Sequence, residues 1–480
     1  MAFGSVTAIA SLFNSIYYQI TKAPIDYNVI ASILDTHAGE ALEYLSSAFA
    51  IRFLVFLIVF CGLTVPFFYF LQRIKVRTPA LASKFVTATM LAFPLSGALH
   101  FSFSHHPLIS FYPAQELYHI NKYLNEVHVL VKEYRAIDHP FTWNLRPSEG
   151  VTSILLLGEA ARRVKFGVFG SDEGATPNLD RFKQENSSNI VLFDEAIASA
   201  AYTRISIPSL LSVLPSKEFS EISRNPGILK IMKAVEQEVV LISNQAKKGF
   251  HDSFITAFME DASSRTYLTD QGHHYDEDLI PLLLRELEKS GENNRLIIVH
   301  LAGSHHPYDL KYPESEAYFS PDTIENKYLN SIRYTDSVMQ SIFEAVMKVE
   351  YPVAMLYTSD HGEYVNDSGD GFHGHGNRVF ITRFVTDVPF FIMYNDSFLK
   401  GFPSEVSNMG RHENVGISHD NVSHTLLGLL GVYDSTYLPQ FDLSSKGFCE
   451  SPRYIIERTG EATLLEDIRF DTTASEEDPF

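Results

Sequence analysis

Short apolar runs alternate with helical stretches from Thr152 onward, and this alternation restricts the fold more than any other feature of the sequence. A short, continuous apolar run is typical of a strand that is buried in a parallel sheet. Strands alternating with helices predict a doubly wound α/β domain with a mostly parallel sheet. The expected strands are 153–157, 239–242, 296–301 and 353–357, and the expected helices are 176–185, 205–214, 278–290 and 326–348.

Three of these strands end in side chains that can bind a metal. Glu159 follows the first strand, His305 follows the third, and Asp360 and His361 follow the fourth. Open α/β sheets place their ligands at the carboxyl ends of the strands, so these side chains are expected to share one rim. Carboxylate oxygen and imidazole nitrogen together suit zinc. Taken singly, Asp360 is better explained as a helix cap and His361 as a satisfied loop residue. Together, the residues predict one metal centre.

Thr203 is the candidate nucleophile. It stands just before an expected helix, where the positive end of the helix dipole favours an alkoxide or a bound phosphate. The alternative is that its hydroxyl simply caps that helix. A hydroxyl becomes a good nucleophile when a metal lowers its pKa. With Glu159, Asp360 and His361 expected nearby, we interpret Thr203 as the nucleophile.

Two uncharged runs upstream, 53–71 and 85–103, have the length of membrane spans. The loop between them carries Arg73, Lys75, Arg77 and Lys84, so the positive-inside rule places that loop in the cytoplasm and the chain after residue 105 outside it. The alternative is a pair of buried core helices. Segment 1–20 is apolar but broken by Ser, Asn and Gly, and it is expected to form a partial or interfacial membrane helix. Residues 1–104 are therefore predicted to be a membrane region.

The remaining regions follow from the pattern of the sequence. Segment 105–147 is expected to connect the membrane region to the globular domain through an amphipathic helix at 114–134, which lies on the membrane surface or packs on that domain. Residues 148–457 form the predicted catalytic domain, and 458–480 a disordered acidic tail. The net charge of −20 argues against a nucleic-acid partner. With only Cys61 and Cys449, neither a disulfide framework nor a cysteine-based zinc site is available.

The chain resembles the membrane-anchored phosphoethanolamine transferases of Gram-negative envelopes, within the alkaline phosphatase and sulfatase superfamily. The resemblance covers nearly the whole chain, with several motifs in the family's order. The matching motifs are Asp35-Thr36-His37-Ala38-Gly39-Glu40-Ala41, Gly158-Glu159-Ala160-Ala161-Arg162, Thr176-Pro177-Asn178-Leu179, Thr203-Arg204-Ile205-Ser206-Ile207-Pro208, Asn244 with Lys248, His305 before Pro307, Ser359-Asp360-His361-Gly362-Glu363, and the pair His373 and His375.

The resemblance implies a set of site residues. Glu159, Thr203, Asp360 and His361 would hold the catalytic zinc, with Thr203 as the nucleophile. His305 and one of the pair His373 and His375 would bind a second zinc ion or the substrate phosphate, and Asn244 and Lys248 would contact that phosphate. The register of the histidine pair stays open. We favour His375, because it precedes the strand at Val388-Pro389 at nearly the family's distance.

The resemblance also implies a function. The chain is expected to transfer phosphoethanolamine from phosphatidylethanolamine to a lipopolysaccharide core sugar, lipid A or a glucan, in the inner membrane with its catalytic domain in the periplasm. The family usually has five membrane helices and often disulfides near the nucleophile. Only two spans are clear here, so an N-terminally truncated member is one interpretation. Ser209 stands where a cysteine is common, which favours a core-sugar or glucan acceptor.

Three alternatives remain open on the same fold. A sulfatase-like hydrolase would use water in place of the acceptor, but sulfatases use a modified Cys or Ser where this chain has Thr203. A phosphoglycerol transferase of the lipoteichoic-acid type also uses Thr, although its surrounding motifs fit less well. The third alternative is an inactive envelope protein that keeps the site but has lost catalysis.

Overall fold

The computed structural model describes residues 113–138, 143–146, 150–245, 254–289, 293–369, 373–375, 381–457, 460–468 and 470. The chain divides into two compact units, and the architecture below is that of the unit that includes Asn121–Phe480. The predicted spans 53–71 and 85–103 and the apolar segment 1–20 lie outside the described residues. Within the described ranges, no helix is both long enough and apolar enough to cross a bilayer.

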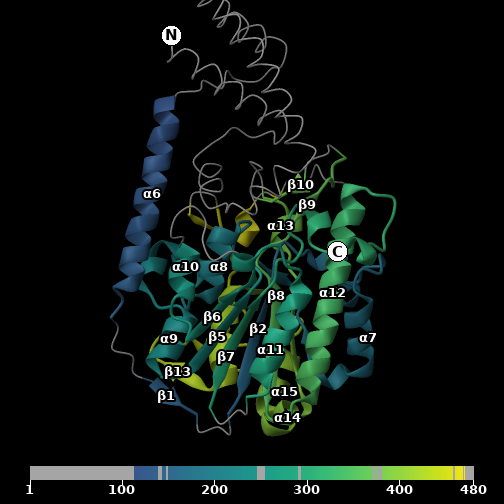
Figure 1. The fold of residues 1–480 in the computed structure, drawn as a ribbon. Helices are drawn as coiled ribbons and strands as arrows, with labels where there is room; N and C mark the ends of the chain where they lie inside the picture. Colours follow the sequence, from purple (N-terminus) through teal and green to yellow (C-terminus); the bar gives the residue numbers. More distant parts are fainter. Residues whose placement is uncertain are drawn as a thin grey trace, which may run out of the picture. The chain divides into compact units, whose positions relative to one another are not determined.

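A seven-stranded sheet forms the centre of this unit (Figure 1). Its neighbouring strands are parallel, except that one strand, β11, runs antiparallel to both of its neighbours. The prediction of an α/β domain with a mostly parallel sheet is therefore confirmed. In spatial order the strands are β3 (Ile190–Leu192), β11 (Phe390–Tyr394), β8 (Val353–Ser359), β2 (Thr152–Gly158), β7 (Arg295–His300), β5 (Glu238–Ser243) and β6 (Ser264–Tyr267).

Helices cover both faces of the sheet, which explains why its central strands are apolar at successive positions. In β2, Leu155 and Leu157 enter one core while Ile154 and Leu156 enter the other. The first core is closed by α6 (Pro113–Arg135), α8 (Thr203–Leu211), α9 (Ile228–Ala234), α10 (Phe254–Met259) and α16 (Asp420–Leu430). The second is closed by α7 (Pro177–Glu185), α11 (Ile280–Leu287) and α12 (Ile324–Lys348), with α7 against α12 (Figure 1).

Smaller elements surround this core. They include four two-stranded pairs and three short helices among the described residues. These are β1 (Trp143–Leu145) with β13 (Val432–Asp434), β4 (Ala196–Ile197) with β12 (Ile417–Ser418), β9 (Tyr364–Val365) with β10 (His373–Gly374), β14 (Tyr454–Ile456) with β15 (Ala462–Leu464), and α13 (Arg383–Thr386), α14 (Asp396–Gly401) and α15 (Pro403–Arg411).

The helix predicted at 114–134 is present as α6 (Pro113–Arg135), and its last turn packs on the core. The Tyr134 ring stacks on Phe258 with 4.2 Å between the ring centroids. Its hydroxyl accepts a hydrogen bond from the backbone N–H of Gly227 at 3.3 Å. The carboxyl end of α6 is thus held by the globular domain, which was one of the two alternatives that the sequence left open.

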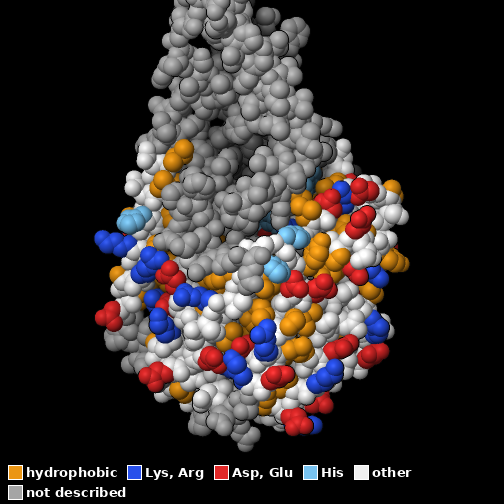
Figure 2. Space-filling view, viewed as in Figure 1, with side chains coloured by type: hydrophobic (Ala, Val, Ile, Leu, Met, Phe, Trp, Pro, Cys, Tyr) orange, Lys and Arg blue, Asp and Glu red, His pale blue; other side chains and the backbone are white. Residues whose placement is uncertain are grey.

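The prediction of a disordered tail was wrong for part of segment 458–480. Ala462–Leu464 form β15, which pairs with β14, and Leu465 is 8% exposed against Ile197 and Ile455. The acidic residues that suggested disorder are concentrated at 476–478, beyond the described residues. On the face shown in Figure 2, acidic and basic side chains are interspersed over the described part, so the net acidity does not form a single-sign patch there.

Candidate metal centre

The carboxyl ends of β2, β7 and β8 bring the predicted metal-binding residues together. Glu159 follows β2, and Asp360 and His361 follow β8; these three residues are 1%, 0% and 0% exposed. The backbone N–H of Asp360 donates to the carbonyl oxygen of Gly158 at 3.1 Å, and the N–H of Ser304, after β7, donates to the carbonyl oxygen of Glu159 at 2.9 Å. Hydrogen bonds between the loops therefore hold this rim in place.

The loop after β2 is shaped by the end of β8. Ala160 has a φ of 56°, a conformation that is uncommon for a residue other than glycine. Its N–H donates to Asp360 Oδ1 at 3.1 Å, and the N–H of Ala161 donates to Ser359 Oγ at 2.8 Å. The side chains that end β8 thus satisfy backbone donors that the tight turn would otherwise leave unpaired.

Four ligand-type atoms converge at this rim. Thr203 Oγ1 lies 3.1 Å from His361 Nε2 and 3.4 Å from Glu159 Oε1. His361 Nε2 lies 3.4 Å from Glu159 Oε1 and 3.2 Å from Asp360 Oδ2. Four N and O ligands placed tetrahedrally about 2.0 Å from a zinc ion are about 3.3 Å from one another. These four distances therefore match the spacing of ligands in a tetrahedral zinc site.

The protonation states of the side chains in the cluster also suit the binding of a cation. His361 Nδ1 lies 2.7 Å from the carbonyl oxygen of Gly362, so it carries the ring proton and leaves Nε2 as a lone pair. Burial lowers the pKa of His361 and favours this neutral form. Asp360 Oδ2 is buried and accepts no hydrogen bond from the described residues. A buried, unpaired carboxylate oxygen beside a lone pair and a second carboxylate calls for a positive partner.

Thr203 enters the cluster as the first residue of α8. The sequence placed it just before a helix starting at 205, with capping as the alternative. In the structure Tyr202 is the N-cap residue, and no side chain caps this helix. The predicted helix start was therefore two residues late, and the capping alternative is wrong. The hydroxyl of Thr203 instead lies between Glu159 and His361.

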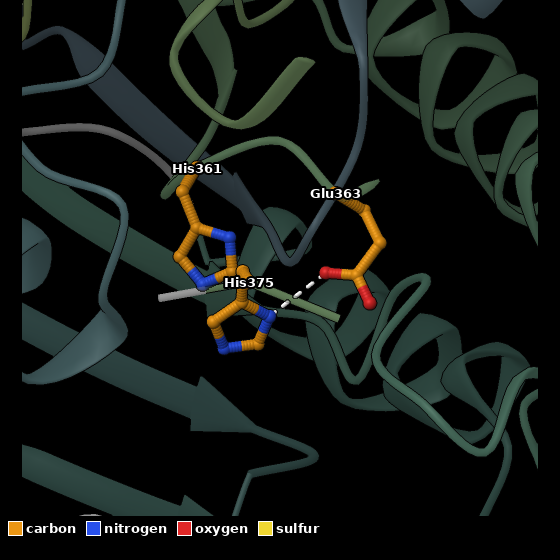
Figure 3. Close-up of side chains that lie close together, drawn as sticks. All are labelled: His361, Glu363 and His375. Carbon is orange, nitrogen blue, oxygen red and sulfur yellow. Dashed lines mark hydrogen bonds and ion pairs between the residues drawn. The ribbon is translucent and has the colours of Figure 1, made fainter. Parts of the chain in front are cut away.

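The histidine pair separates into two different environments. His375 lies against His361, with 3.9 Å between the ring centroids (Figure 3). The ring of His305 lies 5.5 Å from that of His375. His373 Nε2 instead lies 3.1 Å from His306 Nε2. Gly374 between them has a φ of 121°, a conformation that breaks the regular alternation of a strand. Of the two histidines, His375 is the one that the structure brings to the cluster.

The predicted phosphate-binding residues are only partly visible. Asn244 donates its side-chain amide to Asp276 Oδ1 at 2.9 Å and to the carbonyl oxygen of His274 at 3.0 Å. Its own Oδ1 is buried and accepts no hydrogen bond from the described residues. Lys248 lies outside the described residues. Burial lowers the pKa of His305 well below its usual value, so this imidazole is neutral at pH 7.

The sequence did not single out three residues that contact the cluster or support it. Gln245 Nε2 donates to the carbonyl oxygen of Leu301 at 3.0 Å and lies 3.4 Å from Glu159 Oε2. His419, from α16, lies 3.0 Å from the carbonyl oxygen of Ser359 through Nε2. Glu363 contacts His375. Gln245 adjoins Asn244, and Glu363 is the last residue of the motif that contains Asp360 and His361, so both had a usable signal. His419 stands 44 positions beyond the nearest site candidate, His375, and had none.

Comparison with known proteins identifies relatives of this chain. The model of the sulfatase family matches residues 152–432. Phosphoethanolamine transferase EptC of Escherichia coli (strain K12) is 23% identical, with 94% of this chain and 83% of the relative covered. Phosphoethanolamine transferase EptA of Helicobacter pylori is also 23% identical, with 91% of this chain and 84% of the relative covered. The expected resemblance to phosphoethanolamine transferases is confirmed.

Solved structures show the same fold. The integral membrane protein lipooligosaccharide phosphoethanolamine transferase A (EptA) from Neisseria meningitidis superposes with a TM-score of 0.68 at 20% identity, covering 91% of this chain and 86% of that chain. The C-terminal periplasmic domain of Escherichia coli EptC in complex with Zn superposes with a TM-score of 0.63 at 22% identity, covering 71% of this chain and 99% of that chain. The family match spans more than half of the chain, so the chain belongs to the sulfatase family.

Proposed function

We propose that the chain transfers phosphoethanolamine from phosphatidylethanolamine to an acceptor in the bacterial envelope through a covalent intermediate on Thr203. The observation that carries the proposal is the spacing of Glu159, Thr203, Asp360 and His361, which places a nucleophilic hydroxyl among three ligand atoms. The names of the relatives support the transferred group. The Zn complex of a domain with the same fold supports the metal.

The four residues would hold a zinc ion, with one or two ions in the whole site. Bound there, zinc would lower the pKa of the Thr203 hydroxyl and make it nucleophilic at neutral pH. Thr203 Oγ1 then attacks the phosphorus, the bond from phosphorus to the glycerol oxygen breaks, and diacylglycerol leaves with a proton. In the second half-reaction the acceptor hydroxyl attacks the phosphorus, the Thr203–phosphorus bond breaks, and Thr203 regains its proton.

Neighbouring residues would hold the phosphoryl group during both steps. His305 is proposed to contact the oxygens of the phosphoryl group, whereas His375, whose ring lies against His361, is proposed to act in the second step alone. We retain Lys248 as the cation that neutralises the phosphate, because positioning and electrostatics supply most of the catalysis of phosphoryl transfer. Asn244 is assigned differently, because its amide hydrogens are already donated to Asp276 and His274. Its unpaired acceptor suits a donor such as the ammonium group of ethanolamine.

The location and the partners complete the proposal. We propose an inner-membrane protein with a periplasmic catalytic domain, since both the donor and the acceptor would be envelope molecules. The acceptor would be a lipopolysaccharide core sugar, lipid A or a glucan. The proposed domain limits are a membrane region at 1–104, a connecting segment at 105–147 and a catalytic domain that begins at 148 and extends beyond the predicted limit of 457 to include β15.

The test is a donor comparison with the purified full chain in detergent micelles. We expect diacylglycerol release from phosphatidylethanolamine, loss of release in Thr203→Ala, and loss after zinc chelation. Thr335→Ala is the matched control, because Thr335 is buried in α12 and its hydroxyl makes no hydrogen bond with the described residues. A preference for phosphatidylglycerol would reassign the donor, and release of free phosphoethanolamine to water would indicate a hydrolase. No release from any lipid by the zinc-loaded chain would favour the inactive envelope protein.

A further inference from the structure

Glu363, the last residue of the motif that contains the two metal ligands, has both of its carboxylate oxygens occupied. The side chain is completely buried. The hydroxyl of Tyr308 donates to Oε1 at 2.7 Å. Nδ1 of His375 donates to Oε2 at 2.8 Å, the contact drawn as a dashed line in Figure 3. The three residues come from the segments that follow β7, β8 and β10, so they form a hydrogen-bonded chain between three separate parts of the sequence.

This chain determines the tautomer of His375. A carboxylate can only accept, so the proton of the neutral imidazole must lie on Nδ1. Nε2 is then a lone pair on a ring that packs against His361, with 39° between the two ring planes. A carboxylate that receives the imidazole proton and fixes the ring is the arrangement that orients histidines at many metal and catalytic sites. Tyr308 in turn fixes the carboxylate, because its hydroxyl holds the second oxygen.

A second metal site is the competing explanation. His361, Glu363 and His375 have ligand-type atoms within 4.8 Å of one another. However, both oxygens of Glu363 already accept hydrogen bonds, and the Nδ1 atom that approaches the carboxylate is a donor. A metal between Glu363 and His375 would have to displace that hydrogen bond. The contacts therefore match an orienting carboxylate better than a ligand.

We propose that Glu363, supported by Tyr308, is a positioning residue that presents Nε2 of His375 as a hydrogen-bond acceptor for the hydroxyl of the second substrate. This inference rests on the proposed function. It assigns the hydrogen-bonded chain to the second half-reaction, in which the acceptor must be aligned with the phosphoryl group on Thr203. The first half-reaction needs no such acceptor, so the two half-reactions should respond differently to the loss of Glu363.

The experiment measures three quantities on the zinc-loaded full chain: zinc bound per chain, the initial burst of diacylglycerol, and steady-state turnover with acceptor. For Glu363→Ala we expect unchanged zinc, an unchanged burst and turnover reduced about 10- to 100-fold, the usual cost of losing an orienting partner. Glu363→Gln should recover much of the turnover, because its amide oxygen can still accept from Nδ1 while its NH₂ donates to Tyr308.

Further variants distinguish the proposed effect of Glu363 from a general loss of folding. Tyr308→Phe removes only the hydroxyl and should lower turnover less than Glu363→Ala. Tyr351→Phe is its matched control, because that hydroxyl donates to the carbonyl oxygen of Leu287 near the opposite end of β8. Turnover of Tyr351→Phe should match that of the unsubstituted chain. In a His375→Ala background, adding Glu363→Ala should cause no further loss, because the residue acts through His375.

Three results would overturn the inference. Loss of zinc from Glu363→Ala would make Glu363 a ligand, and an equal fall in burst and turnover would remove its link to the acceptor. A further loss in the His375→Ala background would show that it acts independently of His375. If the unsubstituted chain gives no burst, the proposed function fails. The zinc measurement then still distinguishes the two roles of Glu363. Substitution of a ligand lowers the zinc bound per chain, whereas substitution of a positioning residue does not.

Discussion

Gly303→Ala should disrupt the metal centre although Gly303 is not one of the proposed ligands. Gly303 lies in the loop after β7 with a φ of +55°, and its N–H donates to Asp276 Oδ2 at 2.9 Å. A Cβ added there would lie 2.7 Å from the carbonyl oxygen of Glu159 and 2.8 Å from its N. Both are backbone atoms of a proposed ligand. Relief of the clash therefore requires Glu159 itself to move.

The expected cost has two parts. An alanine in the left-handed region costs about 1–2 kcal/mol. Overpacking against backbone atoms typically adds about 1–3 kcal/mol. Restoring ordinary contact, which begins at 3.4 Å, requires the carbonyl oxygen of Glu159 to retreat by several tenths of an ångström. A misplacement on the order of 1 Å costs about 100-fold in rate, so we expect a 10- to 100-fold loss of transferase activity together with weaker zinc binding.

Gly174→Ala provides the matched control. Gly174 has a φ of +70°, and a Cβ there would meet nothing within 4 Å. It carries the same backbone penalty without the contact. Any difference between the two variants in zinc affinity, transfer rate or thermal stability should therefore come from the contact with Glu159 alone. If both variants bind zinc and turn over equally well, the close packing of the β7 loop on Glu159 does not position the ligand, and the reasoning is refuted.

Three further predictions concern stability, each measured by thermal unfolding. Burial raises the pKa of Asp420 to about 6, so ionisation destabilises the fold as pH rises through 6. Asp420→Asn keeps the side-chain oxygen that accepts a hydrogen bond from the backbone N–H of Ser216. This substitution should raise the free energy of unfolding by up to about 3 kcal/mol at pH 8 and leave it unchanged at pH 4; an equal change at both pH values would contradict this. Asn395→Ala should cost about 2–4 kcal/mol, because its buried side chain makes four hydrogen bonds, and a loss under 1 kcal/mol would be inconsistent. Arg135→Gln should cost less than about 1 kcal/mol, since its pair with Glu260 is exposed; a larger loss would count against this.

The fold was largely predictable because the central strands are buried on both faces. All four predicted strands are present, at β2, β5, β7 and β8, with ends shifted by at most two residues. The edge strand β6 was missed because its sequence, SRTY, lacks the apolar pattern on which the others were recognised. The short strand β3 also gave no clear signal, since three residues are too few for a periodicity.

The site was predictable only where the sequence fixes geometry. Glu159, Asp360 and His361 follow predicted strands, and parallel strands bring their carboxyl ends to one rim, so their convergence followed from topology. The choice between His373 and His375 did not, because it depends on the conformation of Gly374. The hydrogen bond from Asn244 to Asp276 was equally unpredictable, since the two residues are brought together only by the folded loops. The assigned roles of all these residues remain proposals.

The most direct test of the central claim is the mass of the peptide that contains Thr203, taken after brief reaction of the zinc-loaded full chain with phosphatidylethanolamine and an acid quench. The account predicts a phosphoethanolamine group on Thr203 that is absent from Thr203→Ala and from the zinc-free chain. Release of diacylglycerol without that adduct, or with the group on another residue, would contradict it.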